Sequence, residues 1–219
     1  WWTNEGKKIS KSLGNTIDPD SMINKFGLEQ FRYFLLREVP LGNDGDFSEA
    51  SFINRINADL SNNLGNLIQR VTKFITKNFN SKIPFDLSQN SSKIEILEDG
   101  YKLIDKSEKL MKNFELSKII DEIFHYINKL NKLVDQNQPW KTFKENPEKA
   151  GYDLSVLIEA FRVVSIILQP YIPIAACKIL DLLNIHEEQR TFKFVDKTYS
   201  IPKNHLINDP EPIFPRYEE

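Results

Sequence analysis

The sequence predicts an all-α protein, in which an antiparallel helix bundle follows an N-terminal loop-helix segment and precedes an irregular C-terminal tail. Apolar residues recur at three- and four-residue steps over most of residues 48–185, as they do on helices that bury one face. Segments rich in proline, asparagine and serine separate these stripes and indicate connections between neighbouring helices. The sequence shows no internal repeat, so it does not indicate a repeat array.

Residues 1–47 combine a polar loop with a helix. The first part of this segment is rich in glycine, serine, lysine and asparagine, a composition that predicts a loop. Asp18 followed by Pro19 indicates a helix start, because aspartate can cap a helix and proline fits its first turn. Apolar residues recur at helical spacing over residues 22–35, and Pro40 ends this helix in a turn-rich connection.

Residues 48–185 are expected to form the bundle. Ser48 is a suitable N-cap for a long first helix. Pro139 ends a later helix, since the residue before a proline avoids helical backbone angles. Asp153 is the expected cap of the next helix, which breaks at Pro170. The apolar stripes cover residues 53–75, 96–110, 116–134 and 157–168, with a loop at 79–93 and a last helix at 175–183.

The remaining residues, 186–219, form a polar tail with four prolines. Proline lacks the backbone N–H that helices and central strands need, so long regular elements are not expected here. Short runs at 192–195 and 198–201 predict a small β-hairpin. The chain is therefore divided into segments 1–47, 48–185 and 186–219.

Composition limits the kinds of partner and site. The 219-residue chain is 40% hydrophobic and has a net charge of −2, so it can bury a core but has no basic excess. Nucleic acid would have to bind at a local patch and not through the overall charge. The single cysteine, Cys177, excludes a disulfide within the chain, and the three histidines lack metal-ligand spacing. No metal site is expected.

The sequence also bears on location. It contains no apolar run of 18 or more residues, so we expect no membrane-spanning helix and no membrane partner. The low cysteine content fits a reducing compartment, and we expect a cytoplasmic protein. Because the chain starts with two tryptophans and without methionine, we expect a fragment of a longer protein.

The stretch 6–15, Gly-Lys-Lys-Ile-Ser-Lys-Ser-Leu-Gly-Asn, is the most informative part of the sequence. Mobile lysine charges, hydroxyls and backbone N–H groups can close over a polyphosphate. Taken as residue types alone, such a cluster is more often a solvated surface loop. The order of the residues is therefore what points to a function.

Asn62, Asn66 and Arg70 lie at four-residue intervals on the expected long helix, which places them in one stripe. Amide side chains can read base edges, and arginine can contact phosphate or stack on a base. Trp140 directly follows Pro139, so we expect a rigid, partly exposed ring that suits an unstacked base. The simpler alternatives are an exposed polar helix face and a tryptophan that caps the bundle.

Lys8-Ile9-Ser10-Lys11-Ser12 resembles the Lys-Met-Ser-Lys-Ser signature of class I aminoacyl-tRNA synthetases, with Ile9 in place of methionine. The resemblance implies a loop that binds ATP and stabilises the charge that develops on pyrophosphate, through preorganised electrostatics. By this resemblance the catalytic lysines are Lys8 and Lys11, and Ser10 and Ser12 complete the ATP-binding set.

Further segments narrow the resemblance to methionyl-tRNA synthetases. These segments are residues 1–3, 26–27, 31–38, 45–48, 57–67, 131–140 and 212–216. The resemblance implies a helix bundle of the class I synthetase anticodon-binding type, in which a tryptophan stacks on the cytosine of a CAU anticodon. The residues that match the family's anticodon-binding set are Asn62, Asn66, Arg70, Asp135, Pro139 and Trp140.

The implied activity is that of an ATP-dependent ligase that joins methionine to tRNA(Met) in two steps. ATP with Mg²⁺ would be the substrate complex of the full enzyme, which also needs an upstream catalytic domain of the same polypeptide. We expect the fragment alone to be inactive and to hold no bound cofactor. Arg32 and Arg37 are compatible either with tRNA backbone contacts or with simple helix-surface charge.

Three other functions remain as alternatives. A class I synthetase for isoleucine, valine or leucine is disfavoured by the pairing of the asparagine stripe with Pro139 and Trp140. A stand-alone helical RNA-binding module would have no use for the lysine loop. A helical scaffold that binds no RNA is supported mainly by the near-neutral charge.

Overall fold

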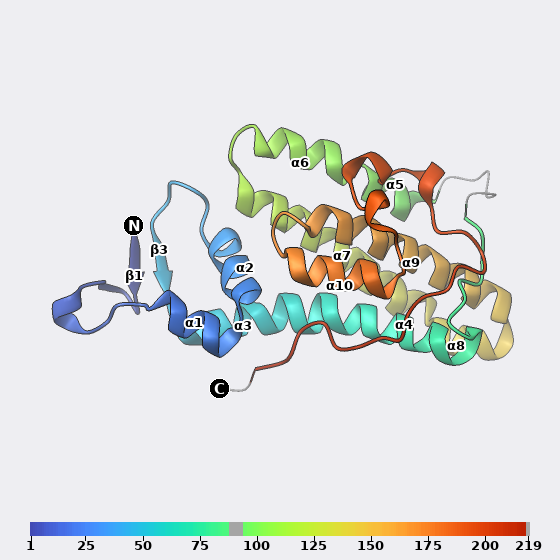
Figure 1. Cartoon of the computed structure of the whole chain (residues 1–219), viewed down its shortest axis with the longest axis horizontal. Coiled ribbons are helices and arrows are strands. Elements are labelled where there is room, and N and C mark those ends of the chain that lie inside the picture. The colour runs from blue at the N-terminus through green and yellow to red at the C-terminus, as the bar shows by residue number, and fades with distance from the viewer. Residues whose placement is uncertain (88–93, 218–219) are drawn as a thin grey trace.

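Helices make up most of the computed structural model, which describes residues 1–87 and 94–217 (Figure 1). In chain order the helices are α1 (Pro19–Phe26), α2 (Leu28–Glu38), α3 (Glu49–Ile56), the π-helix η2 (Asn57–Gly65), α4 (Asn66–Phe79), α5 (Glu95–Tyr101), α6 (Leu103–Met111), α7 (Leu116–Asn137), α8 (Pro139–Glu145), α9 (Pro147–Leu168) and α10 (Pro173–Leu182). The 3-10 turns are η1 (Lys11–Leu13), η3 (Glu187–Gln189), η4 (Phe192–Phe194) and η5 (Lys197–Tyr199), and the strands are β1 (Trp2–Asn4), β2 (Lys7–Lys8) and β3 (Gly45–Phe47). The predicted helical fold is confirmed, with a small sheet added to it. Residues 88–93 of the predicted loop 79–93 lie outside the described residues.

The strands form one sheet, in the order β2-β1-β3, at the end of the molecule that carries the N-terminus (Figure 1). β1 pairs antiparallel with β2, with Thr3 opposite Lys8, and parallel with β3, with Trp2 opposite Gly45. A Cβ at Gly45 would lie 2.5 Å from Cγ2 of Val39 and 3.1 Å from the Trp2 ring. A glycine is therefore needed for β3 to lie this close to the ring.

The capping residues predicted for two helix starts are confirmed. The Asp18 carboxylate accepts hydrogen bonds from the backbone N–H groups of Asp20 and Ser21, at 3.3 and 3.2 Å. The Ser48 hydroxyl accepts one from the N–H of Ser51 at 3.1 Å. Both caps satisfy N–H groups that have no partner within their own helix.

Two other helix boundaries differ from the prediction. The single helix expected after Pro19 is broken at Gly27, whose φ of 93° is incompatible with a continuous helix. Asp153 lies inside α9 and does not cap it. That helix begins earlier because Asn146 accepts a hydrogen bond from the N–H of Lys149 at 3.0 Å and Pro147 occupies the first turn.

The hairpin predicted in the tail is wrong, since residues 192–201 contain the 3-10 turns η4 and η5. The Arg162 guanidinium donates to the carbonyl oxygen of Phe194 at 2.6 Å. The Asp196 side chain accepts from the N–H of Thr198, also at 2.6 Å. These bonds engage backbone groups that a β-ladder would have used.

The core is centred on α9. Almost all of its residues from Ala150 to Leu168 are buried, and α4, α5, α7, α8 and α10 pack around it. A helix that is covered on all sides is apolar around its whole circumference. The single apolar stripe seen in the sequence therefore understated how deeply this helix is buried.

Glu159 and Arg162 are charged residues that lie deep inside this core, with relative exposures of 0% and 2%. The guanidinium donates to the Glu159 carboxylate at 2.9 and 2.6 Å. The carboxylate also accepts from the Tyr101 hydroxyl and from the N–H of Ile201, both at 3.1 Å. Burial opposes the charge of Arg162, but the bonds and charge of Glu159 outweigh it and raise the pKa of Arg162.

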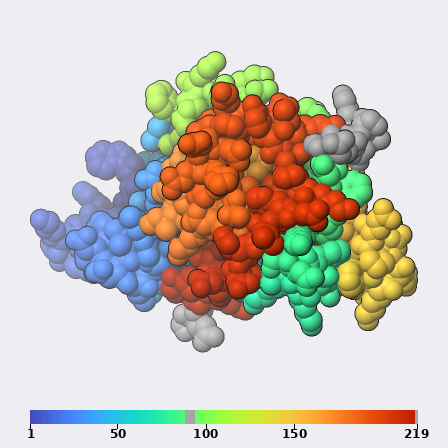
Figure 2. Space-filling model, turned by 45° about the vertical axis from the view of Figure 1, so that its right-hand side comes forward, coloured from blue at the N-terminus to red at the C-terminus, as the bar shows by residue number. Residues whose placement is uncertain are grey.

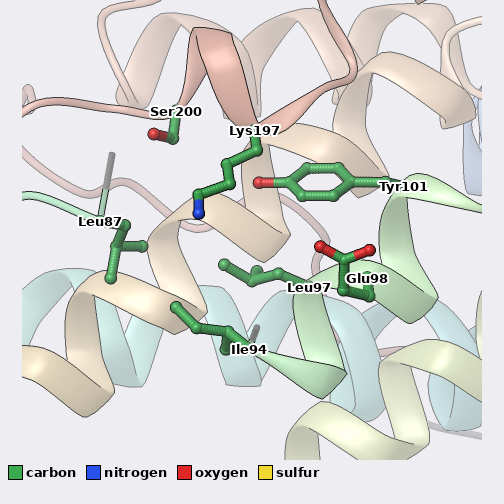
Figure 3. Close-up of a pocket in the computed structure, with 7 residues that line it drawn as sticks. All are labelled: Leu87, Ile94, Leu97, Glu98, Tyr101, Lys197 and Ser200. Atoms are coloured by element: carbon green, nitrogen blue, oxygen red, sulfur yellow. The ribbon is translucent and has the colours of Figure 1, made fainter. Parts of the chain in front are cut away.

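This network fastens the tail to α5 and α9. Figure 3 shows Tyr101 at a small pocket where α5 meets the tail, with Lys197 and Ser200 on the tail side and Leu97 below. The pocket belongs to the packing of the tail, since the hydroxyl of Tyr101 is engaged by the buried carboxylate.

The end of the tail runs back along η2 toward the N-terminal segment (Figure 1). The Asn57 side chain donates to the carbonyl oxygen of Tyr217 at 2.7 Å and accepts from its N–H at 3.0 Å. The Ser61 hydroxyl donates to the carbonyl oxygen of Pro215 at 2.7 Å. Figure 2 shows the tail (red) spread over one face, with the N-terminal segment (blue) and the region around α8 (yellow) projecting on opposite sides.

Candidate nucleic-acid interface and lysine loop

The predicted lysine loop is a β-hairpin followed by a 3-10 turn. Glu5 and Gly6 join β1 to β2 with left-handed backbone angles, φ 51° and 70°, which suits a two-residue hairpin turn. Ser10 caps η1, because its hydroxyl accepts from the N–H of Leu13 at 3.2 Å. The turn ends at Gly14, with φ 64°. The signature residues therefore have a defined backbone path.

Asn15 closes this loop. Its side chain donates to the carbonyl oxygen of Lys8 at 3.1 Å and accepts from the N–H of Ser10 at 2.9 Å. The carbonyl oxygen of Asn15 accepts from the side chain of Asn4, in β1, at 2.9 Å. The loop is thus tied both to itself and to the sheet.

Lys8 and Lys11, the predicted catalytic lysines, are both exposed on this loop. Ser12 is also exposed, and its hydroxyl oxygen lies 3.1 Å from that of Ser10. Two mobile cations with adjacent hydroxyls and backbone N–H groups are suited to an extended, highly charged anion such as a polyphosphate.

The predicted polar stripe lies on the continuous rod formed by α3, η2 and α4. Asn62 and Asn66 are exposed and Arg70 is half-buried. Leu60 and Leu64 on the same rod are buried, at 0% and 1% exposure. The four-residue spacing thus separated the polar face from the core face, but it did not reveal that nine residues here form a π-helix.

The predicted tryptophan stands at a sharp corner between two helices. α7 ends at Asn137, Gln138 has a left-handed φ of 42°, and Pro139 is the buried first residue of α8. Trp140 follows it and is half-buried. Proline therefore starts a new helix here as well as ending the preceding one.

The structure brings Arg70 and Trp140 together, although 69 residues lie between them in the sequence. Cζ of Arg70 lies 4.6 Å from the centroid of the indole ring, in cation–π contact. Phe74 meets the indole in a T-shaped contact at 6.3 Å, and Phe143 packs on Phe74 at 5.4 Å. The phenylalanine rings thus support the indole ring, and the guanidinium covers part of it.

A chain of amide groups joins η2 to α7. The Asn63 side chain donates to Oδ1 of Asn128 at 2.9 Å. The Asn131 side chain donates to Oδ1 of Asn63 at 2.7 Å and to its carbonyl oxygen at 3.2 Å. Asp135, from the predicted anticodon set, is exposed one turn further along α7.

Arg32 and Arg37 have partners within the chain. Arg32 donates to the carbonyl oxygens of Pro170 and Tyr171, at 2.8 and 3.0 Å, and Arg37 forms an ion pair with Asp121. The interactions of both arginines attach α2 to the bundle, so each side chain has a structural role irrespective of RNA.

The N-terminal segment with β1 and helix α8, which carries Trp140, lie toward opposite ends of the long axis (Figure 1). One ligand can touch both only if it is elongated. Among residues 1–87 and 94–217, no group of three or more histidine, cysteine, aspartate or glutamate side chains is arranged to hold a metal ion. The same residues include no helix that is long and apolar enough to span a membrane.

Comparison with known protein families identifies the class of this protein as the class I tRNA synthetases. A sequence-family model described as "tRNA synthetases class I (M)" matches residues 1–72, and one described as "Anticodon binding domain of methionyl tRNA ligase" matches residues 83–219. The chain therefore belongs to the methionyl-tRNA synthetase family.

Individual relatives agree with this assignment. The chain is 43% identical to the methionine–tRNA ligase of Rickettsia felis, over all of this chain and 43% of that protein. It is 39% identical to the ligase of Fusobacterium nucleatum, over all of this chain and 35% of that protein. The structure of Mycobacterium tuberculosis methionyl-tRNA synthetase with methionyl-adenylate aligns with a TM-score of 0.88 and 31% identity, covering 98% of this chain and 43% of that one. The chain thus spans less than half the length of these relatives.

Sequence reasoning missed several residues that shape the two sites. Phe74 could have been found, because it lies one turn after Arg70 on the same helix face. Asn15 lies three residues after the signature, but its bonds to the loop backbone had no sequence signal. The same holds for Asn63 and Asn128, whose contact joins segments distant in sequence.

Proposed function

We propose that this chain is part of an ATP-dependent methionine–tRNA ligase and contributes both the lysine loop and the anticodon-binding surface of that enzyme. The observation that carries the proposal is the stacked pair of Arg70 and Trp140 beside the exposed amides Asn62 and Asn66. Helix α8, which carries Trp140, lies at the far end of the molecule from the N-terminal segment that carries the lysine loop (Figure 1). A tRNA, read at its anticodon and charged at its other end, is the elongated ligand that this separation suits.

Lys8 and Lys11 are the proposed catalytic lysines, and Ser10 and Ser12 complete the proposed ATP-binding set. The exposure of Lys8, Lys11 and Ser12 suits contact with the triphosphate of ATP, which enters as a substrate complex with Mg²⁺. The residues would act by preorganised charge and hydrogen bonds on the leaving pyrophosphate. Methionine binding and the rest of the catalysis are assigned to an upstream catalytic domain of the same polypeptide.

The proposed anticodon set contains six residues from η2, α4 and the junction of α7 with α8, where the buried Pro139 holds the half-buried Trp140 at the start of α8. Trp140 offers an indole face to the cytosine of CAU, Arg70 can contact the base or its phosphate, and the amides can read base edges. The full set is Asn62, Asn66, Arg70, Asp135, Pro139 and Trp140.

The proposed division of labour follows the segments of the chain. Segment 1–47 carries the signature loop and the helices that connect it to the bundle, 48–185 is the anticodon-binding bundle, and 186–219 is the tail that holds the two together. We further propose a cytoplasmic location, where tRNA(Met), the macromolecular partner, is charged.

Titration of this chain with a tRNA stem-loop that bears CAU, compared with the same stem-loop bearing UAU, tests the proposal. We expect tighter binding of CAU and loss of this preference in Trp140→Ala. Trp1→Ala is the matched control, because that tryptophan is 96% exposed at the opposite end. Equal affinity of the unchanged chain for the two stem-loops would refute the anticodon role and favour a helical scaffold.

A further inference from the structure

The π-helical part of the long rod is the most unusual backbone of the bundle. The N–H of Asn66 donates to the carbonyl oxygen of Ser61, five residues earlier, instead of four as in an α-helix. In an α-helix each four-residue step advances about 40° around the axis, so residues at this spacing drift around the rod. A π-helical turn contains more residues than an α-helical turn, so it changes the angle around the axis between the side chains of Asn62 and Asn66.

A π-helix is less favourable than an α-helix, so a run of nine such residues needs support from outside the helix. The tail supplies support on one side, through the bonds of Asn57 and Ser61 to its backbone. On the other side the support comes from α7, through the amide of Asn63.

Asn63 makes more contacts across this junction than its neighbours. Its side chain donates to Asn128 and accepts from Asn131, and its backbone carbonyl accepts a second bond from Asn131. Asn131 in turn lies on the helix that leads to Trp140. A second contact, between Arg70 and Trp140, joins the same two segments further along. The two contacts fix how the polar stripe lies relative to the indole platform.

We propose that Asn63 is a positioning residue for anticodon recognition. It holds the π-helical turn against α7 and thereby sets the position of Asn62 and Asn66 relative to Trp140, without itself touching the base. This inference rests on the proposed function of the surface. Without the amide of Asn63 the turn can relax toward an α-helix, which changes the angle around the axis between the two readers and their position relative to Trp140.

The test is Asn63→Ala in this chain, with affinities measured for the CAU and UAU stem-loops. Two neutral hydrogen bonds are lost, and we expect the preference for CAU to fall about tenfold, which corresponds to ~1.4 kcal/mol. Asn128→Ala, which removes only one of these bonds, should have a smaller effect. Asn78→Ala is the matched control, because its amide donates to the carbonyl oxygen of Phe74, on its own helix.

The ratio of the two affinities separates positioning from folding, since a loss of folded protein lowers both affinities equally. Retention of the full preference in Asn63→Ala, while Trp140→Ala loses it, would overturn this inference and leave the proposed function intact. If Asn63→Ala and Trp140→Ala both kept the full preference for CAU, the result would instead count against the proposed function.

Hydrogen–deuterium exchange of the free chain provides a second measurement that does not depend on RNA. Asn63→Ala should speed exchange at least fivefold at the backbone N–H groups of residues 64–67, because the turn has lost its support (about 1 kcal/mol). Asn78→Ala should leave them unchanged. Unchanged exchange in Asn63→Ala would also overturn the inference.

Discussion

The buried pair of Glu159 and Arg162 predicts a large loss of stability for the nearly isosteric change Glu159→Gln. The carboxylate accepts four hydrogen bonds, from Arg162, Tyr101 and Ile201. Glutamine has one acceptor oxygen and no charge, so a guanidinium that is 2% exposed would lose its buried counter-charge. Removal of one partner from a buried ion pair costs about 3–5 kcal/mol, which is a large part of the roughly 5–15 kcal/mol that stabilises a typical domain.

Urea unfolding followed by helical circular dichroism measures this loss. Tyr101→Phe is the matched control, since it removes a single donor at 3.1 Å and should cost about 0.5–1.5 kcal/mol. The double change Glu159→Leu with Arg162→Met should cost less than Glu159→Gln alone, because it removes both charges. The reasoning would be refuted if Glu159→Gln lost no more stability than Tyr101→Phe.

Three further predictions concern other parts of the chain. Burial raises the pKa of the Asp153 carboxyl above its ordinary value of 3.8. The folded protein therefore loses stability as the pH rises past that value, because the buried carboxyl must then ionise. Asp153→Asn should therefore raise the free energy of unfolding at neutral pH, and the gain should vanish near pH ~3, as urea titrations at the two pH values would reveal. Gly45→Ala should lower stability by about 1–3 kcal/mol, because its methyl would collide with the side chain of Val39. Thermal melting measures this loss, and an unchanged melting temperature would contradict the prediction. In an enzyme that includes the catalytic domain, Lys11→Ala should slow ATP–pyrophosphate exchange by about 10²–10³-fold, whereas Lys7→Ala should not, and equal rates for the two variants would contradict the assigned role.

The parts of the fold that could be predicted are those decided within one or two helical turns. Asp18 and Ser48 cap helices because their side chains reach N–H groups two or three residues ahead. Leu60 and Leu64, which alternate with Asn62 and Asn66 along the rod, point to the core because the rod is helical throughout, whichever type of helix it forms.

Two failed helix boundaries, at Gly27 and Asn146, have local causes, but the other failures depend on contacts across long stretches of sequence. The tail does not form a hairpin because Arg162, on a distant helix, binds the carbonyl oxygen of Phe194. The sheet could not be predicted because the paired residues of β1 and β3 are 43 positions apart, and the strands are two or three residues long. The π-helix leaves an apolar pattern that looks α-helical, so the sequence did not reveal it. The contacts that support it join segments distant in sequence.

The candidate anticodon surface lies between these cases. The spacing of Asn62, Asn66 and Arg70 predicted a common face, and the sequence placed Trp140 at a helix end. That Arg70 lies on the indole ring was not predictable from either motif alone, because it depends on how α4 packs beside α8. Of the residues that hold this arrangement in place, Phe74 had a sequence signal, whereas the contact of Asn63 with Asn128 was recognisable only in three dimensions.

The coupling between Trp140 and the first anticodon base is the most direct test of the claim that this surface reads CAU. Four affinities are needed, for the unchanged chain and Trp140→Ala, each with a CAU stem-loop and with one whose cytosine is replaced by an abasic residue. A stacked base predicts a coupling free energy of about 1–3 kcal/mol. A coupling of about zero, with the two changes simply additive, would contradict the claim that the cytosine stacks on Trp140.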